Sequence, residues 1–146
     1  MTLTSPAFKG NEQIPSKYTC DGADISPPLF IADVPAQAKS LVLIVDDPDA
    51  PSGRFIHWTA WNIPPDTSEM GEDDLPEGAV EGGTGFGEPG YGGPCPPDRE
   101  HRYFFKLCAM DSLINLSAGA TVDMLENAIE HHVLAEAELM GRYERK

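Results

Sequence analysis

The apolar residues of this chain fall into short runs that are separated by clusters of glycine, proline and acidic residues. The runs near 40–46, 55–63 and 102–110 are rich in β-branched and aromatic residues, a composition that predicts three well-formed β-strands. Weaker runs near 3–8 and 28–32 predict two further strands. Because 14 glycines and 14 prolines punctuate the sequence, we expect many turns and few long helices.

Only the C-terminal part shows apolar residues at helical spacing. This predicted helix begins at Thr121, a suitable cap, and ends at Gly141, a suitable stop. Its apolar positions are Leu125, Ile129, Val133, Ala137 and Met140. A second, short helix is predicted near 66–74. Together these patterns predict a mainly β fold of two packed sheets with peripheral helices, in a single domain spanning residues 1–146.

A long connection runs from Pro64 to His101, between the second and third strong strands. Connections of this length in compact domains are usually functional or disordered. Residues 85–90 formally match the GxGxxG fingerprint of dinucleotide-binding proteins. However, Pro89 interrupts the match, and the fingerprint should follow a strand and open a helix. We therefore interpret this glycine-rich stretch as backbone that can approach a ligand closely.

The charge balance limits the possible partners. With 24 acidic and 10 basic residues, the net charge is −14, which argues against nucleic acid and anionic lipid surfaces. No apolar run reaches the ~18 residues of a membrane span, and the first residues lack the pattern of a signal peptide. We therefore expect a cytoplasmic protein without stable membrane insertion.

The cysteine count gives little indication of a structural role. The number of cysteines is odd, and the three positions, Cys20, Cys95 and Cys108, form no CxxC motif. We therefore expect neither a disulfide framework nor a zinc knuckle. One alternative is a disulfide between two copies of the chain through one of these cysteines, which would give a homodimer.

Three acidic residues follow the first strong strand directly. In "SLVLIVDDPDAP", residues 40–51, the apolar run is followed by Asp46, Asp47 and Asp49. Pro48 lies between the last two of these acids, and Pro51 follows them. Asp and Pro are common in turns. However, Asp47 at the end of a sheet would be partly buried, and a buried carboxylate needs hydrogen-bond donors.

Two histidines are the candidate donors. His57 lies within the second strong strand, and His101 opens the third. Singly, the first is typical of a satisfied core residue and the second of a surface residue, but neighbouring strands would bring both to Asp47. The set suits either an anion pocket or a two-histidine, one-carboxylate metal site. Because no HxD or HxE pair is present, we expect no metal, and we expect no other cofactor.

Four motifs in order resemble the phosphatidylethanolamine-binding protein family: "DPDAP" at 47–51, "HW" at 57–58, "GPCPP" at 93–97 and "HRYFF" at 101–105. Two more segments, 18–29 and 131–145, are similar to its bacterial and archaeal, Raf kinase inhibitor-like branch. The resemblance implies a Greek-key β-sandwich of two antiparallel sheets. It also implies a compact pocket for a small anion, such as phosphate or the phosphorylethanolamine headgroup.

The resemblance also implies which residues form the pocket. Its ligand-binding residues would be Asp47, His57, His101, Tyr103, Gly93 and Pro94, supported by Asp49, Pro51, Trp58 and Arg102. Strand alternation places Arg102 on the opposite face from His101. Few X–Pro bonds in folded proteins are cis, but the turn after "DPDA" is tight in this family, so the resemblance implies a cis Ala50–Pro51 bond.

The function that follows is that of a non-enzymatic, anion-binding protein. One alternative is a protein-interaction module that inhibits a serine protease or kinase through an ordered loop, for which 78–97 is the candidate. An enzyme that uses Asp47, His57 and His101 has less support, because no nucleophile lies beside a base in any recognised motif.

Overall fold

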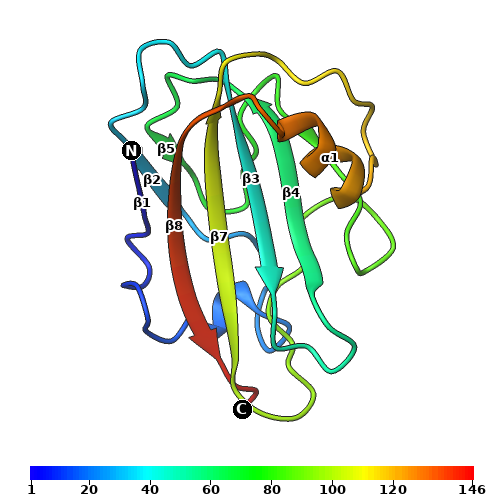
Figure 1. Ribbon diagram of the computed structural model, residues 1–146. Helices are drawn as coiled ribbons and strands as arrows, with labels where there is room; N and C mark the ends of the chain where they lie inside the picture. Colours follow the sequence, from blue (N-terminus) through cyan, green and yellow to red (C-terminus); the bar gives the residue numbers. More distant parts are fainter.

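The computed structural model describes residues 1–146 as two antiparallel β-sheets (Figure 1). The smaller sheet has the order β1–β2–β5: β1 is Thr2–Thr4, β2 is Leu29–Ala32 and β5 is Glu69–Met70. The larger sheet has the order β6–β4–β3–β7–β8: β3 is Ser40–Asp47, β4 is Phe55–Ile63, β6 is Val80–Glu81, β7 is His101–Met110 and β8 is Val133–Tyr143. A 3₁₀ helix, Ser16–Tyr18, and α1, Val122–Ile129, complete the fold. The mainly β prediction with two antiparallel sheets is confirmed.

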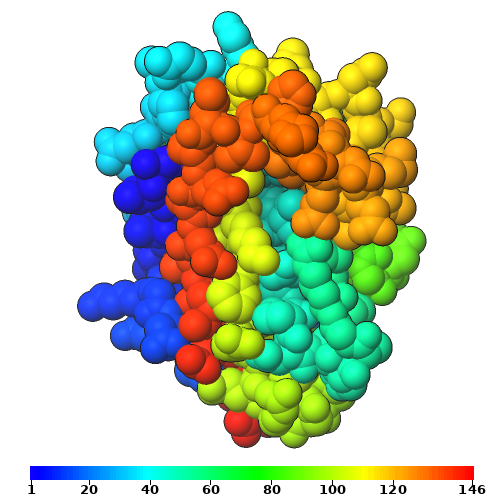
Figure 2. Space-filling view, in the orientation of Figure 1, coloured from blue at the N-terminus to red at the C-terminus, as the bar shows by residue number.

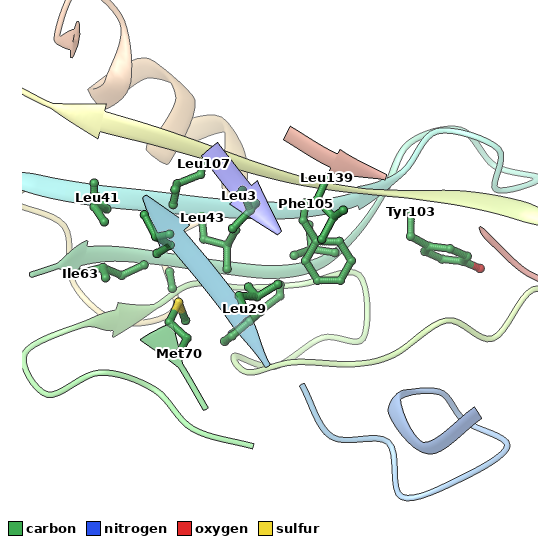
Figure 3. Close-up of a cluster of buried hydrophobic side chains, with 14 of the residues drawn as sticks. Leu3, Leu29, Leu41, Leu43, Ile63, Met70, Tyr103, Phe105, Leu107 and Leu139 are labelled. Carbon is green, nitrogen blue, oxygen red and sulfur yellow. The ribbon is translucent and has the colours of Figure 1, made fainter. Parts of the chain in front are cut away.

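The apolar run of β3 reflects its position in the middle of the larger sheet. All eight of its residues are buried, because both faces of this strand are covered. One face packs into the core between the two sheets (Figure 3). Val42 and Ile44, on the other face, pack under α1 with Leu125 and Ile129. In Figure 2, α1 covers only part of this outer face, and side chains of β7 and β3 remain visible beside β8.

The connections between strands bring the ends of three strands together at one end of the larger sheet. β3 and β4 form neighbouring strands, and β7 then pairs with β3 instead of β4, so the chain crosses over as in a Greek key. Asp47 therefore pairs with Phe55, the first residue of β4, while β7 begins at His101 on the other side. The end of β3 and the beginnings of β4 and β7 lie together near the C-terminus in Figure 1.

The long C-terminal helix is the main error of the sequence prediction. Thr121 does cap α1, and its hydroxyl oxygen accepts a hydrogen bond from the Met124 N–H at 3.2 Å. The helix nevertheless ends at Ile129, and residues 133–143 form strand β8, which pairs with β7 along its length. This segment also alternates between small or apolar and polar residues. The strand periodicity prevails because β7 provides an open edge.

Two further differences concern local structure. The predicted helix at 66–74 is wrong, because this segment contains a turn followed by β5. The predicted cis bond before Pro51 is also wrong, because all peptide bonds are trans. Neither helix is long and apolar enough to cross a membrane.

The cysteine prediction is wrong as well. Cys20 and Cys95 form a disulfide between positions 75 residues apart, with their Cα atoms separated by 5.4 Å. Cys108 is the free thiol. An odd count is compatible with one bridge, so parity alone did not exclude an intramolecular disulfide.

Candidate functional site

A pocket of about 270 Å³ lies at the end of the larger sheet where β3 ends and β4 and β7 begin. Its polar groups come mainly from these three strands, whereas aromatic and proline side chains form most of the remaining wall. The lining residues are Asp47, Ala50, Pro51, Ser52, Phe55, His57, Phe86, Cys95, Pro96, Pro97, His101 and Tyr103.

A β-bulge positions His57 in this pocket. Val45 pairs with Trp58 and Asp46 pairs with Ile56, so His57 is the extra residue of β4 at this point. Such a bulge redirects side chains and increases the local twist of the strand. As a result, the His57 ring lies 5.2 Å from the Tyr103 ring, centroid to centroid, although Tyr103 comes from another strand.

The His57 side chain is arranged as a neutral imidazole. Burial lowers its pKa, and this effect outweighs the hydrogen bond to Gly92 and the negative charge of Asp47, which both raise it. Nδ1 lies 2.7 Å from the Gly92 carbonyl oxygen, to which it can only donate. The neutral tautomer therefore carries its proton on Nδ1 and leaves a lone pair on Nε2.

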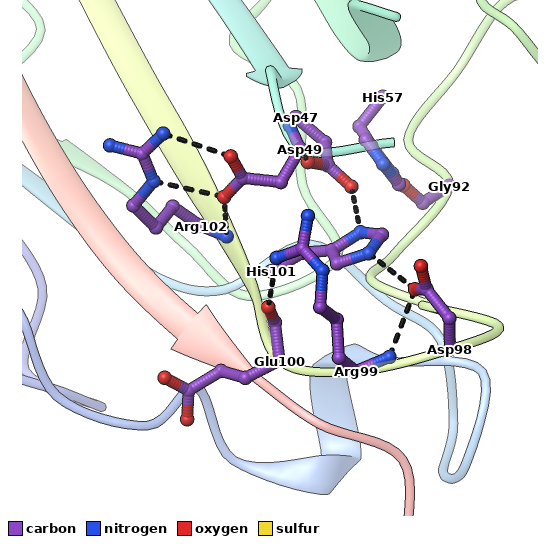
Figure 4. Close-up of polar contacts among 9 residues, drawn as sticks. All are labelled: Asp47, Asp49, His57, Gly92, Asp98, Arg99, Glu100, His101 and Arg102. Carbon is purple, nitrogen blue, oxygen red and sulfur yellow. Dashed lines mark hydrogen bonds and ion pairs between the residues drawn. The ribbon is translucent and has the colours of Figure 1, made fainter. Parts of the chain in front are cut away.

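His101 lies between two carboxylates (Figure 4). Its Nδ1 is 2.7 Å from Asp47 Oδ2, and its Nε2 is 2.7 Å from Asp98 Oδ1. Neutral imidazole has a single N–H, so it can satisfy only one ionised carboxylate, whereas imidazolium satisfies both. This geometry therefore favours a positively charged His101. Desolvation raises the pKa of Asp98, but the hydrogen bond from His101 contributes to a net lowering.

Asp49 and Arg102 support the site from outside. Asp49 N–H donates to Asp47 Oδ1 at 2.7 Å, which fixes the second oxygen of the pocket carboxylate. The Asp49 carboxylate in turn accepts two hydrogen bonds from the Arg102 guanidinium, at 2.8 and 2.9 Å, and one from its backbone N–H. The guanidinium hydrogen bonds hold the pKa of Asp49 well below its usual range. Arg102 thus faces away from the pocket, as strand alternation predicted, and does not line it.

Asp46, the first acidic residue of the "DDPD" stretch, points to the opposite face of the sheet. Asp46 Oδ2 accepts from Arg54 at 2.7 Å and from Lys106 at 3.0 Å. Arg54 and Lys106 line a larger groove of about 770 Å³ beside α1. Each of the three carboxylates at the end of β3 and just after it therefore has its own partner among the Arg, Lys and His side chains, and only Asp47 lines the pocket.

The Asp49–Arg102 pair predicts a pH-dependent contribution to stability. Asp49→Asn should lower the free energy of unfolding near pH 7 by about 1 kcal/mol, a small value because Arg102 is partly exposed. Since folding lowers the pKa of Asp49, this contribution exists above the ordinary carboxyl pKa of ~3.9 and is lost as pH falls below it. Urea unfolding at about pH 7 and pH 3 should show the difference shrinking in acid. Asp66→Asn, an exposed control, should show no such trend.

Tyr103 supplies an unused polar group. Its side chain is buried, and its hydroxyl has no hydrogen-bond partner. Burial is the largest cause that raises the pKa of this hydroxyl, and the neighbouring Asp47 carboxylate adds to it through its charge and through a contact whose geometry is too poor for a hydrogen bond, so the hydroxyl stays protonated. A buried hydroxyl without a partner is uncommon, and one that lines a pocket is available to a ligand or a water molecule.

The structure brings together part of the predicted residue set. Asp47, His57, His101, Tyr103 and Pro51 all line the pocket. Besides Asp49 and Arg102, which support it from outside, three predicted residues do not line it: Gly93, Pro94 and Trp58.

Each of these three residues has a different role. The Gly93 N–H donates to Asp24 Oδ1 at 2.7 Å, and the Pro94 carbonyl accepts from Cys20 N–H at 3.1 Å, so this turn anchors the wall behind the pocket. Trp58 packs in the core and donates to Glu81 at 2.7 Å.

Sequence reasoning missed Phe55, Phe86, Cys95 and Asp98. Phe55 lies two residues before His57, so strand alternation could have indicated it. Asp98 precedes His101 by three residues, a spacing with no special meaning in a loop. Both His101 nitrogens already contact carboxylates, so neither offers a free lone pair to a metal. The expected absence of a metal stays a prediction.

This fold and pocket define a small two-sheet protein with a pocket of about 270 Å³ at one end of its larger sheet. Residues 4–144 match the family model of the phosphatidylethanolamine-binding proteins. The chain belongs to this family. A UPF0098 protein of Methanothermobacter thermautotrophicus is 50% identical, and the alignment covers 99% of each chain. A UPF0098 protein of Pyrococcus horikoshii is 51% identical, with 97% of this chain and 76% of the relative covered.

Two crystal structures are also similar. A phosphatidylethanolamine-binding protein homologue of Chlamydia trachomatis gives a TM-score of 0.96 at 47% identity, covering 99% of this chain and 97% of the other. E. coli YbcL, described as a member of the mammalian family, gives 0.92 at 34% identity, covering 99% and 98%. These similarities agree with the two-sheet fold.

Proposed function

We propose that this protein is a non-enzymatic binding protein whose pocket takes a small phosphate-type anion, such as a phosphomonoester headgroup. The observation that carries the proposal is the buried, unpartnered Tyr103 hydroxyl, which lines a pocket together with two histidines. A phosphate oxygen can accept from this hydroxyl and lie in the field of the charged His101.

The carboxylate of Asp47 restricts the form of the ligand. His101 and the Asp49 N–H already donate to it, but its oxygens keep lone pairs that repel a fully ionised phosphate. A group that carries a proton meets no such repulsion. We therefore infer that the ligand presents either a P–OH or an ammonium group to Asp47, as a singly protonated phosphate or a zwitterionic headgroup does.

The size and lining of the pocket fit a headgroup better than a whole lipid. Its volume of about 270 Å³ is at the lower end of small-molecule sites. The rings of Phe55 and Phe86 pack edge to face at 5.0 Å and form an apolar wall. Such a wall limits water access and strengthens the polar contacts within the pocket.

The proposal predicts that phosphate-type ligands bind more tightly as pH falls. In the free protein the lowered pKa of His57 keeps its Nε2 unprotonated near neutrality. A bound anion favours imidazolium, so binding takes up a proton and affinity should fall by up to about tenfold per pH unit as pH rises. Calorimetric titration with phosphorylethanolamine from about pH 5.5 to 8 tests this.

Two controls separate the protein's titration from the ligand's. Because phosphate itself ionises near pH ~6, acetate serves as a ligand of constant charge. His57→Gln should flatten the acetate profile. His132→Gln should leave it unchanged, because this exposed histidine directly precedes β8 and contacts Asp111, far from the pocket. An acetate affinity that is constant across this range in the parent protein would contradict a role for His57 protonation.

The inhibitor alternative has less support. An inhibitory loop must be exposed and ordered. Residues 91–94 of the candidate segment 78–97 are instead hydrogen-bonded to residues 18–24, so this part of the segment does not project as a free loop. The enzyme alternative also has little support, because Cys95 is held in a disulfide and no nucleophile contacts either pocket histidine.

A further inference from the structure

We propose that Cys20–Cys95 is a thiol–disulfide exchange site whose oxidised form maintains the ligand pocket. The inference rests on the proposed function, because it concerns the affinity of the same pocket. In this arrangement the disulfide controls ligand binding without contacting the polar groups that hold the anion.

The position of Cys95 connects the disulfide to the pocket. Cys95, Pro96 and Pro97 form one continuous part of the pocket wall. Asp98, the next residue, holds Nε2 of His101 at 2.7 Å. A displacement of this segment would therefore open the wall and remove one of the two partners of His101.

Few other interactions hold this segment in place. From Cys95 to Glu100 the backbone makes no hydrogen bond to another backbone group, and the side-chain attachments of this segment lie at its far end, from Asp98 to His101 and from Glu100 to Gln13 and Arg142. Residues immediately before Cys95 are attached to the 18–24 segment by three hydrogen bonds, namely Tyr91 hydroxyl to Tyr18 O, Gly93 N to Asp24 Oδ1 and Cys20 N to Pro94 O. The disulfide is the attachment that lies within the pocket wall itself.

The disulfide lies near the protein surface, where a thiol reagent could approach it. Both Cys20 and Cys95 are partly exposed, as attack on a disulfide sulfur requires. The remaining thiol is a poor competitor, because burial raises the pKa of Cys108 to about 11. Cys108 also lines the groove beside α1 instead of the ligand pocket.

The exchange reaction balances with a dithiol as the reductant. A thiolate of the dithiol attacks one sulfur of the pair, forms a mixed disulfide and releases the other cysteine as a thiolate, which takes up a proton. The second thiol of the reductant then breaks the mixed disulfide. The products are two protein thiols and one reductant disulfide, after transfer of two electrons.

This chemistry makes the pocket sensitive to its surroundings. Oxidising compartments preserve disulfides, whereas cytosolic thiols reduce accessible ones. The oxidised protein would keep the Cys95–Pro97 wall ordered for the ligand. In the reduced protein, part of the binding energy would be spent on ordering this segment again.

The test compares ligand binding by the oxidised and reduced full-length protein. Phosphorylethanolamine is titrated calorimetrically into each form, after treatment with dithiothreitol and its anaerobic removal for the reduced form. We expect affinity to fall by about tenfold on reduction. Cys20→Ser should bind like the reduced protein under all conditions, while Cys108→Ser, the matched control, should respond to reduction as the parent does.

A readout that does not depend on the ligand accompanies the titration. Amide hydrogen exchange at Gly92 and Gly93, whose N–H groups donate to the His57 carbonyl and to Asp24, should accelerate on reduction, while the amides of β3 remain protected. Equal affinity and equal exchange in the two redox forms would overturn the redox inference. If the oxidised protein does not bind phosphorylethanolamine, the proposed function is wrong, and the exchange data alone decide whether the disulfide orders the pocket wall. If Cys20→Ser does not fold, reduction of the parent protein still gives both readouts.

Discussion

His101→Ala should destabilise the protein by about 3–5 kcal/mol, because it removes one partner of a buried ion pair. His101 is 1% exposed, and its Nδ1 lies 2.7 Å from Oδ2 of Asp47, which is also buried. Without the ring, Asp47 would keep the hydrogen bond from Asp49 but would lose its opposing charge. The free energy of unfolding, measured by urea denaturation near pH 7, should show this loss directly.

Matched variants identify the cause of this loss. Asp98→Ala removes the other, more exposed partner of His101 and should have little effect. The double variant Asp47→Ala/His101→Ala should be more stable than the sum of the two single changes predicts, because neither charge is then left alone. If Asp98→Ala destabilises the protein as much as His101→Ala, the buried pair is not the source of the energy. His101→Ala should also lose phosphorylethanolamine binding.

The convergence of the pocket residues follows from features that the sequence displays. The runs that form β3, β4 and β7 are long and rich in apolar, β-branched or aromatic residues, which marks them as inner strands. In two paired antiparallel strands, the last residues of one strand lie beside the first residues of the other. Asp47 and His101 satisfy this condition, so their proximity could be predicted once the strands were neighbours.

His57 could be predicted from the sequence only in part. A regular strand would direct His57 and Trp58 to opposite faces of the sheet. The bulge in β4 changes this alternation and brings the His57 ring to Tyr103. The position of a bulge depends on how two strands fit together, and no residue type in "FIHWTAWNI" marks it.

The C-terminal segment shows where periodicity fails as a guide. The apolar residues of 121–141 fit a helical period, yet those of 133–143 fit a strand period as well. His131 has a positive φ of 70°, which ends the helical course before β8. At Gly141, an added Cβ would lie 2.5 Å from Ile14 Cγ1, so the glycine permits close packing in a strand and is not a helix stop. Long-range pairing with β7 decided the outcome, and local sequence does not record it.

Gly93→Ala is the second change for which we expect a large effect. A Cβ at this position would lie 2.2 Å from the Tyr18 carbonyl oxygen and 2.5 Å from Asp24 Oδ1. The first of these atoms belongs to the backbone, so it cannot move without displacing the 18–24 segment. We expect the substitution to lower the free energy of unfolding by about 1–3 kcal/mol, the usual cost of overpacking.

The same substitution should also weaken ligand binding, although Gly93 does not line the pocket. The alanine would separate the segment before Cys95 from its anchor and disrupt the hydrogen bond from the Gly93 N–H to Asp24. The Cys95–Pro97 wall should then lose its alignment even while the disulfide is intact. Calorimetry with phosphorylethanolamine on oxidised Gly93→Ala measures this effect, and urea unfolding measures the stability loss.

Gly71→Ala is the matched control, because the nearest atom to its added Cβ is 3.7 Å away, an ordinary contact. This control should keep both stability and affinity close to those of the parent. Normal binding by a destabilised Gly93→Ala would mean that the wall keeps its position through the disulfide alone. Normal binding together with normal stability would mean that the close approach of the two segments is not needed at all. Only a joint loss of stability and affinity supports a shared anchor for the fold and the pocket, because the backbone contact at Tyr18 would then serve both.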